Sequence, residues 1–378
     1  MKIFLSHGYF VAEDAKEQAI MRPYPPLGLL YVAAHLREEG HHVRVHDSTF
    51  SDRSAWWRDL EHDAPDALAL YVNLMTRCTV VELIREVRSH GSLSAIPVIL
   101  GGPETRYHAE EFLSHGADVC VIGEGETTAA EVVKALKDRS CHELHDISGI
   151  AFRDHAGKVI RTTERVLDRD IDALPLPSRD LIDMGAYSRA WKQKHGHDAF
   201  SVSTMRGCPY TCRWCSRAVY GLSYRRRSPA KVVDELEHLV KTYSPDRFWF
   251  VDDVFTVSHK WLREFAQELE QRGVRIAYEC ITRADRMNTE VIELLKASGC
   301  VQVWIGAESG SQKIIDAMDR RVDVGQVQAM IRATKWAGIR AGTFIMLGYP
   351  GETITDIDRT VVHLKNSGPD DFTITVAY

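Results

Sequence analysis

The chain has 378 residues, of which 44% are hydrophobic and 26% charged, and its formal net charge is −6. So long a chain exceeds one ordinary hydrophobic core, so we expect two domains. The acidic balance argues against a general nucleic-acid binder, and no apolar run approaches the roughly 18 residues of a membrane span. The N-terminus lacks the features of a signal peptide, so we expect a cytoplasmic protein.

The first 140 residues alternate short apolar runs with helical patterns. The apolar runs are KIFL (2–5), HVRVHD (42–47), ALALYV (67–72), PVILGG (97–102) and VCVIGE (119–124). The helical patterns between them, with apolar residues three and four apart, are LGLLYVAAHLREE, VVELIREVRS, HAEEFLSH and TAAEVVKALKD. Five strands separated by helices predict a flavodoxin-like, doubly wound parallel sheet. We assign residues 1–145 to this domain.

Residues 146–199 interrupt the alternation and are assigned to a linker. Within them, ISGIAFRDHAGKVIR predicts a hairpin that turns at residues 155–157, and Pro175 and Pro177 predict an extended connector.

Alternation resumes at residue 200 with longer helices. The six predicted strands are FSVSTM, RFWFVD, RIAYECI, VQVWIG, AGTFIML and DFTITVAY, and the helices between them begin near Pro229, Ser258, Thr289, Ser311 and Thr353. This pattern predicts a partial (βα)6 barrel over residues 200–378. Because no helix follows the sixth strand, we expect the natural barrel to continue past Tyr378. The basic run 225–227 is interpreted as a solvated face.

Three of the eight cysteines lie within eight residues, as Cys208-x-x-x-Cys212-x-x-Cys215 on a loop after the first barrel strand. In a cytosolic chain this clustering indicates a metal site rather than disulfides. Three thiolates suit three corners of an iron–sulfur cluster. A structural zinc ion would need a fourth ligand, and the nearest candidates, His195 and His197, precede the strand.

The spacing of these cysteines resembles that of the radical S-adenosylmethionine superfamily over residues 200–378. The resemblance implies a 4Fe–4S cluster on Cys208, Cys212 and Cys215, with S-adenosylmethionine on the open iron. It also implies reduction by an external flavodoxin- or ferredoxin-type donor and formation of a 5′-deoxyadenosyl radical.

The same resemblance implies roles for side chains near the strand ends. Trp214 would touch the adenine, Asp252 and Asp253 would bind the methionine ammonium, and Arg283 would pair with the methionine carboxylate. The family often has Gly-Gly-Glu where this chain has the aspartate pair, which leaves the contact open. The alternatives are that an aspartate caps the following helix and that Arg283 is an ordinary surface arginine.

Two further positions come from the same resemblance. Glu308 would bind the ribose hydroxyls, and the segment 342–348, which starts at Gly342, would pack against adenine. We expect both to lie at C-terminal strand ends, where barrel active sites are found.

The N-terminal segments YPPLGLLYVAAHLREEGHHVRVHD, GGPET and GADVCVIGEGETT resemble the cobalamin-binding radical S-adenosylmethionine enzymes over residues 24–137. The resemblance implies a cobalamin site at the C-terminal edge of the first sheet. The residues placed there are Asn73, Thr76, Gly101, Gly102, Pro103, Glu124 and Gly125. The absent side chains of the glycines would allow a flat ligand to approach closely, and the alternative is that they only form a turn.

Cobalamin proteins that place histidine on cobalt use Asp-x-His-x-x-Gly after the first strand. Here His7 directly precedes Gly8, so the spacing fails. We therefore expect cobalamin bound base-off, with no histidine on the metal.

Together these features predict a cobalamin-dependent radical enzyme that transfers a methyl group to an unactivated carbon of a small-molecule or natural-product substrate. One alternative is a non-methylating enzyme of the same family, resembling an oxidative cyclase. A methylthiotransferase would need three further cysteines, which Cys78, Cys120 and Cys141 could supply. A cobalamin-storing module is the third alternative, and the three-cysteine loop counts against it.

Overall fold

The computed structural model describes residues 1–137 and 143–377, and the chain divides into two compact units. The first unit comprises Met1–Gly196 together with Arg217–Gly221, and the second comprises His197–Ser216 and the chain from Leu222 onward. The domain limits predicted at residues 145 and 199 stay predictions. No helix in the described part of the chain combines the length and the apolar character needed to cross a membrane.

The first unit is built on a seven-stranded sheet in the order β2-β1-β3-β4-β5-β6-β7. Its strands are β1 (Lys2–His7), β2 (His42–His46), β3 (Ala67–Tyr71), β4 (Val98–Gly101), β5 (Val119–Val121), β6 (Ile150–Arg153) and β7 (Val159–Arg161). The first five strands are parallel, and their order is that of flavodoxin. The predicted hairpin forms β6 and β7, which continue the sheet in antiparallel pairing.

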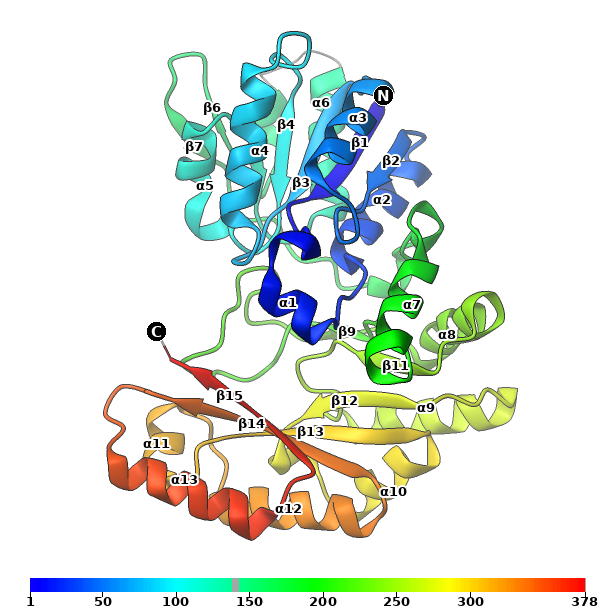
Figure 1. Cartoon of the computed structure of the whole chain (residues 1–378), viewed down its shortest axis with the longest axis vertical. Helices are drawn as coiled ribbons and strands as arrows, with labels where there is room; N and C mark the ends of the chain where they lie inside the picture. The colour runs from blue at the N-terminus through cyan, green and yellow to red at the C-terminus, as the bar shows by residue number, and fades with distance from the viewer. Residues whose placement is uncertain (138–142, 378) are drawn as a thin grey trace. The chain divides into compact units, whose positions relative to one another are not determined.

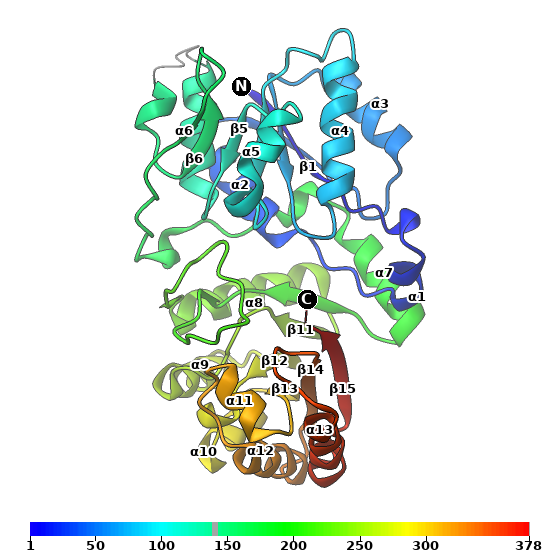
Figure 2. The ribbon, with the colours of Figure 1, turned by 90° about the vertical axis from the view of Figure 1, so that its left-hand side faces the viewer.

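Helices cover both faces of this sheet, as the two views of Figures 1 and 2 show. Packed on one face are α2 (Leu27–Glu38) and α6 (Glu126–Lys137), and on the other α3 (Arg53–Asp63), α4 (Arg77–Ser89) and α5 (Thr105–Ser114). Adjacent residues of a strand point to opposite faces, so Phe4 joins the core under α3–α5 while Ile3 and Leu5 join the core under α2 and α6. The doubly wound fold is therefore confirmed.

Three helices of the first unit were not predicted from the sequence. They are α1 (Ala15–Ile20), α3 and α7 (Met184–His195). In α3 the only buried apolar residues are Trp56 and Leu60, too few to produce a recognisable stripe. The helix is instead defined at its start by Asp52, whose carboxylate accepts a hydrogen bond from the Ala55 N–H.

The second unit contains a six-stranded parallel sheet that curves into a partial barrel (Figure 1). Its strands follow chain order: β8 (Ala199–Val202), β11 (Arg247–Phe250), β12 (Tyr278–Thr282), β13 (Cys300–Glu308), β14 (Arg340–Leu347) and β15 (Asp371–Val376). The helices are α8 (Pro229–Tyr243), α9 (His259–Arg272), α10 (Thr289–Ala297), α11 (Gln312–Ala317), α12 (Val324–Trp336) and α13 (Ile354–Ser367). The predicted partial (βα)6 barrel is confirmed.

One detail of the predicted barrel is wrong. Two helices, α11 and α12, connect β13 to β14 where the sequence predicted one. Asp319 and Arg321 between them have φ values of 50° and 54°, which a continuous helix cannot contain. Asp323 then begins α12 by accepting a hydrogen bond from the Gln326 N–H.

Candidate active site

The cysteine loop, residues 207–224, leaves the barrel through a narrow neck. Its two ends are joined by β9 (Met205–Arg206) and β10 (Arg225–Arg226), which pair antiparallel. At the neck Gly207 has φ +77°, and a Cβ atom there would lie 2.5 Å from the carbonyl oxygen of Ser223. Only glycine fits this conformation and this approach, so Gly207 closes the loop at its base.

The loop carries three thiols at different depths. Cys208 is partly buried, Cys212 is buried and Cys215 is exposed. Burial raises the pKa of the Cys208 thiol. Among the described residues, no three His, Cys, Asp or Glu side chains are already gathered as metal ligands. The donor set itself fits an iron–sulfur cluster, because all three side chains are soft sulfur ligands on one loop.

A zinc site is not supported by His195, one of the two candidate histidines. His195 lies on α7 in the first unit, where its Nε2 atom is 3.0 Å from the carbonyl oxygens of Ile20 and Met21. That nitrogen is already engaged with the backbone.

Arg283, which follows β12, is buried and not a surface arginine. Its side chain is 4% exposed. The Nη1 group donates to the Sγ of Cys212 at 3.4 Å, and the Nη2 group donates to the carbonyl oxygen of Arg320 at 2.6 Å. The guanidinium therefore touches one of the three thiols directly.

The two aspartates after β11 have different surroundings. Asp252 is buried, and its Oδ1 atom accepts hydrogen bonds from the Thr204 N–H at 2.8 Å and the Met205 N–H at 3.1 Å. Its Oδ2 atom accepts the Thr204 hydroxyl. Asp253 is exposed and makes no hydrogen bond or ion pair with the described residues. Neither caps the next helix, because Ser258 caps α9.

Desolvation by the surrounding protein raises the pKa of both carboxyl groups, and Asp252 raises that of Asp253 further. Asp252 therefore anchors the chain entering the cysteine loop, while the carboxyl group of Asp253 is left exposed.

The interpretation of residues 225–227 as a solvated face is wrong, because all three arginines are largely buried. Arg226 lies with its Cζ atom 3.6 Å from the centre of the Trp261 ring, and its Nη2 atom is 3.7 Å from Asp252. Arg227 pairs with the buried Glu235. The sequence shows the charge of such a run but not its burial. Here Arg226 and Arg227 are countercharges to the buried carboxylates of Asp252 and Glu235.

Glu308 ends β13 in a buried position. Its Oε1 atom lies 3.4 Å from the Nη2 atom of Arg320, and burial raises the pKa of its carboxyl group. Its φ of +64° is unusual for a residue other than glycine, and such strain is concentrated at functional sites. Gly306 makes room for the pair, because a Cβ atom there would overlap Arg320.

The predicted stretch 342–348 runs to the C-terminal end of β14, which stops at Leu347, but Gly342 itself lies near the start of that strand. It is the third residue of β14, and a Cβ atom there would lie 2.5 Å from the Trp304 ring. The missing side chain therefore makes room for Trp304 on the neighbouring strand. Trp214 lies in the cysteine loop with 38% of its surface exposed.

At the carboxyl edge of the first sheet, the predicted polar residues bond to each other. The Asn73 N–H donates to the Thr76 hydroxyl, and the Thr76 N–H donates to the Asn73 side chain, both at 3.0 Å. This turn presents Leu74 and Met75, which are 56% and 60% exposed. Sequence reasoning passed over both, although two apolar residues inside a polar turn were a usable signal.

The glycines of this edge differ in how much space surrounds their Cα atoms. A Cβ atom at Gly102, where φ is +121°, would overlap the carbonyl oxygen of Val72, whereas one at Gly101 would meet nothing within 4 Å. Gly125 makes room for Val32 of α2, with a Cβ distance of 3.1 Å. Pro103 follows in the same turn, and Glu124 precedes α6. The open space at Gly101 and the exposed Leu74 and Met75 fit a large ligand with an apolar surface.

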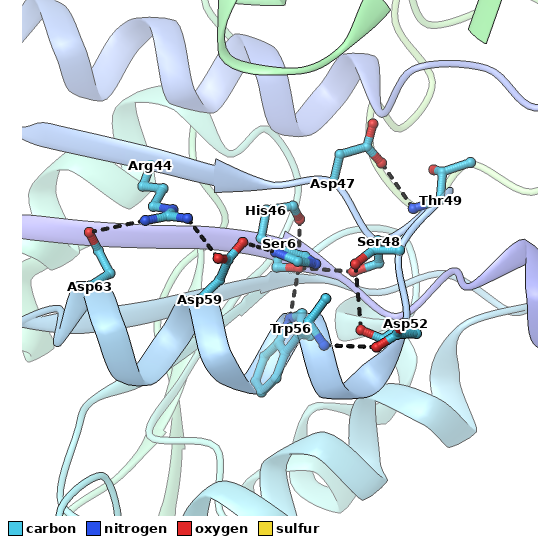
Figure 3. Close-up of polar contacts among 12 residues, drawn as sticks. Ser6, Arg44, His46, Asp47, Ser48, Thr49, Asp52, Trp56, Asp59 and Asp63 are labelled. Atoms are coloured by element: carbon cyan, nitrogen blue, oxygen red, sulfur yellow. Dashed lines mark hydrogen bonds and ion pairs between the residues drawn. The ribbon is translucent and has the colours of Figure 1, made fainter. Parts of the chain in front are cut away.

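At the same edge of the sheet, the carboxyl ends of β1 and β2 hold a buried polar network (Figure 3). The Ser6 hydroxyl donates to the carbonyl oxygen of His46 at 2.8 Å and accepts the Trp56 indole N–H at 3.0 Å. His46 in turn contacts Asp59 at 2.8 Å.

His7 belongs to the same network and is 3% exposed. Its Nε2 atom contacts Asp47 at 2.9 Å, and its Nδ1 atom accepts the Tyr9 N–H at 3.2 Å. Burial opposes ionisation of Asp47, but the hydrogen bonds from His7 and Tyr187 outweigh it and lower the pKa of Asp47 to about 2. Both ring nitrogens of His7 are therefore engaged within the protein.

A flavodoxin-like sheet followed by a partial barrel, with a three-cysteine loop after the first barrel strand, defines a two-part α/β protein. Residues 202–364 match the Radical SAM superfamily and residues 20–133 match the B12 binding domain.

The chain is similar to three known proteins. An uncharacterized methyltransferase of Pyrococcus horikoshii is 30% identical over 97% of this chain and 79% of that protein. The anaerobic magnesium-protoporphyrin IX monomethyl ester cyclase of Rubrivivax gelatinosus is 26% identical over 98% of this chain and 66% of that protein, just under two thirds of its length. The structure of the radical S-adenosylmethionine methyltransferase TsrM from Kitasatospora setae shares the fold, with a TM-score of 0.79 and 20% identity over 99% of this chain and 72% of that one.

The chain belongs to the radical SAM superfamily, and it carries a B12 binding domain ahead of the barrel. This confirms the predicted cofactors: S-adenosylmethionine, cobalamin and the 4Fe–4S cluster that the superfamily uses.

Proposed function

We propose that the protein is a cobalamin-dependent radical S-adenosylmethionine methyltransferase that acts on an unactivated carbon of a small molecule. The observation that carries this proposal is the three-cysteine loop at the barrel's first strand, in a chain that also has a B12 binding domain. The methyltransferase of Pyrococcus horikoshii, which this chain resembles over most of its length, supports it.

In this proposal Cys208, Cys212 and Cys215 hold the cluster. When bound, the cluster supplies the single electron that cleavage of S-adenosylmethionine needs. An external one-electron donor of the flavodoxin or ferredoxin type would provide it. The neck of the loop, closed by Gly207 and anchored by Asp252, keeps the thiols beside the barrel mouth.

The chain's charged groups would orient S-adenosylmethionine. Asp253 offers an exposed carboxyl group for the methionine ammonium, and Glu308 offers one for the ribose hydroxyls. Arg283 has five N–H donors and uses some of them for hydrogen bonds within the protein, so others remain for the methionine carboxylate. Trp214 would stack on adenine. We assign Asp252 and Gly342 to positioning, since their surroundings are already filled by protein.

Cobalamin would lie against the carboxyl edge of the first sheet, bordered by the turn 73–76, the turn 101–103 and Glu124–Gly125. Leu74 and Met75 supply apolar contacts there. We propose a base-off cofactor without histidine on cobalt, because both nitrogens of His7 are engaged. The paramagnetic cob(II)alamin spectrum should lack nitrogen superhyperfine splitting, and splitting that vanishes in His7→Ala would contradict this.

We also propose the domain limits 1–145, 146–199 and 200–378, and a cytoplasmic location.

The proposal is tested by incubating the reduced, reconstituted protein with candidate substrates and S-adenosylmethionine that carries a 13C-labelled methyl group. Mass spectrometry should find the label on a carbon of the product. A product without the label but with two hydrogens removed would favour the second candidate, an oxidative cyclase, which the similarity to the Rubrivivax gelatinosus cyclase supports. Neither product from a cobalamin-loaded protein would favour a storage module.

A methylthiotransferase is not favoured. Cys120 is fully buried in the first core, and burial raises the pKa of its thiol to about 12, which opposes metal binding. Cys78 is exposed on α4, and Cys141 lies outside the described residues.

A further inference from the structure

Arg283 is held on several sides by fixed partners. Its Nε group donates to Asp285 at 2.8 Å and its Nη2 group to the backbone carbonyl of Arg320 at 2.6 Å. The face of the guanidinium lies over Tyr210, with the Cζ atom 4.0 Å from the ring centre. These contacts leave the group little freedom, so the direction of its remaining N–H groups is set by the fold.

One of those remaining groups points at sulfur. The Nη1 group donates to the Sγ of Cys212 at 3.4 Å, and both side chains are buried. The backbone holds the sulfur in place as well, because the Arg213 N–H next to it donates to the carbonyl oxygen of Met318 at 3.0 Å. An arginine keeps its charge at any pH at which the protein is folded, and a charged donor in buried surroundings makes a strong hydrogen bond.

We propose that Arg283 is a positioning residue that sets the reduction potential of the cluster through its hydrogen bond to the Cys212 sulfur. This rests on the proposed function, in which Cys212 is a cluster ligand. One electron from an external donor takes the cluster from its 2+ to its 1+ state, and no bond to protein is made or broken. The added negative charge is stabilised by a cationic donor on a ligand sulfur, so the contact raises the potential.

Other charged groups lie near this contact, among them Arg321, which interacts electrostatically with Cys212. Asp285 pairs with Arg283 and orients it, and Arg286 lies 3.8 Å from the same carboxylate and 5.5 Å from the Tyr210 ring centre. Only Arg283 of this group directs a described hydrogen bond to a thiol of the loop. This makes Arg286 a matched control. It ends the short 3-10 helix Ala284–Arg286 that Arg283 precedes, and it has the same charge as Arg283 but does not contact the sulfur.

The test is a redox titration of the reconstituted, full-length protein with dithionite, followed by electron paramagnetic resonance. The titration is run without S-adenosylmethionine, so that a contact of Arg283 with the methionine carboxylate cannot change the measured midpoint potential. Arg283→Met should lower the ratio of reduced to oxidised cluster at the wild-type midpoint about tenfold, which is about 59 mV for one electron. Arg283→Lys should restore part of the shift, and Arg286→Met should match wild type.

Two results would overturn the inference alone: an unchanged midpoint in Arg283→Met with full iron content, or an equal shift in Arg286→Met. If Arg283→Met fails to hold the cluster, Arg283→Lys decides in its place. A midpoint below wild type in Arg283→Lys supports the inference and an unchanged midpoint overturns it. A wild-type protein that takes up no cluster would instead overturn the proposed function itself.

Discussion

In the first unit, the carboxyl edge of the sheet consists of turns whose polar atoms bond to one another and whose exposed side chains, Leu74 and Met75, are apolar. In the second unit, the corresponding edge carries buried charges in pairs, such as Asp252 with Arg226 and Glu308 with Arg320. The difference matches the proposed ligands. A large cofactor with an extended apolar surface needs shape and space, whereas an amino-acid cosubstrate and an iron–sulfur cluster need charge.

The largest effect should come from replacing a cysteine of the loop. The replacement should abolish cluster binding at the edge of the second sheet and leave cobalamin binding at the edge of the first sheet unchanged. Anaerobically reconstituted wild-type protein should hold about four irons per chain. Cys212→Ala should hold essentially none, because no neighbouring thiolate can replace it, while about one equivalent of cobalamin remains bound. Iron and cobalamin analyses of the same sample measure both. Full iron content in the variant, or zinc in equal amount, would refute the cluster assignment.

The two aspartates after β11 provide the next test, since they contrast a structural charge with an available one. Asp252→Asn should lower the free energy of unfolding by about 3 kcal/mol, because it places an amide group among three donors and leaves Arg226 without its countercharge. Iron content should fall with it. Urea unfolding and iron analysis are the measurements.

Asp253→Asn is the matched control. Its stability should stay within about 0.5 kcal/mol of wild type with full iron, and only its affinity for S-adenosylmethionine should fall. The reverse order of stabilities would mean that the two roles are assigned to the wrong residues.

Most of the fold could be predicted because its signals are local in the sequence. The site was harder to predict, because several of its residues act through contacts with residues far away in the sequence. Apolar runs and their spacing predicted the strands of both sheets, and the three cysteines were found because their signal lies within eight residues. The function of Gly102 and Gly342 depends on Val72 and Trp304 of neighbouring strands, which no local pattern reveals.

The same limit explains the error at residues 225–227. A basic run shows its charge in the sequence, but its burial depends on Glu235, Asp252 and Trp261. Helix α3 was missed for a related reason, because it buries so few apolar residues.

A pH-dependent effect should appear in the polar network of the first unit. Asp47 has a pKa of about 2 in the folded protein, below its ordinary value of 3.8, so its ionised form stabilises the fold. Asp47→Asn should therefore lower the free energy of unfolding by about 2 kcal/mol at pH 7. Because the folded pKa is depressed, this contribution is complete above about pH 4 and is lost as the pH falls through about 2.

Urea unfolding over a pH series measures that contribution. Glu38→Gln, at an exposed position on α2, is the control and should change nothing. A difference between Asp47→Asn and wild type that stays constant down to pH 3 would contradict the role assigned to the carboxylate.

The smallest effects should distinguish the two glycines at the cobalamin edge. Gly102→Ala adds a Cβ atom that overlaps the Val72 carbonyl oxygen at a φ of +121°, so it should cost more than about 1 kcal/mol of stability. Gly101→Ala meets nothing within 4 Å and should stay within about 0.5 kcal/mol of wild type. Gly101→Leu extends into the same open space, so it should leave stability almost unchanged but reduce the cobalamin retained after gel filtration. Undiminished retention would mean that the space beside Gly101 is not part of the cofactor site, and the turn 101–103 would then be a structural turn alone.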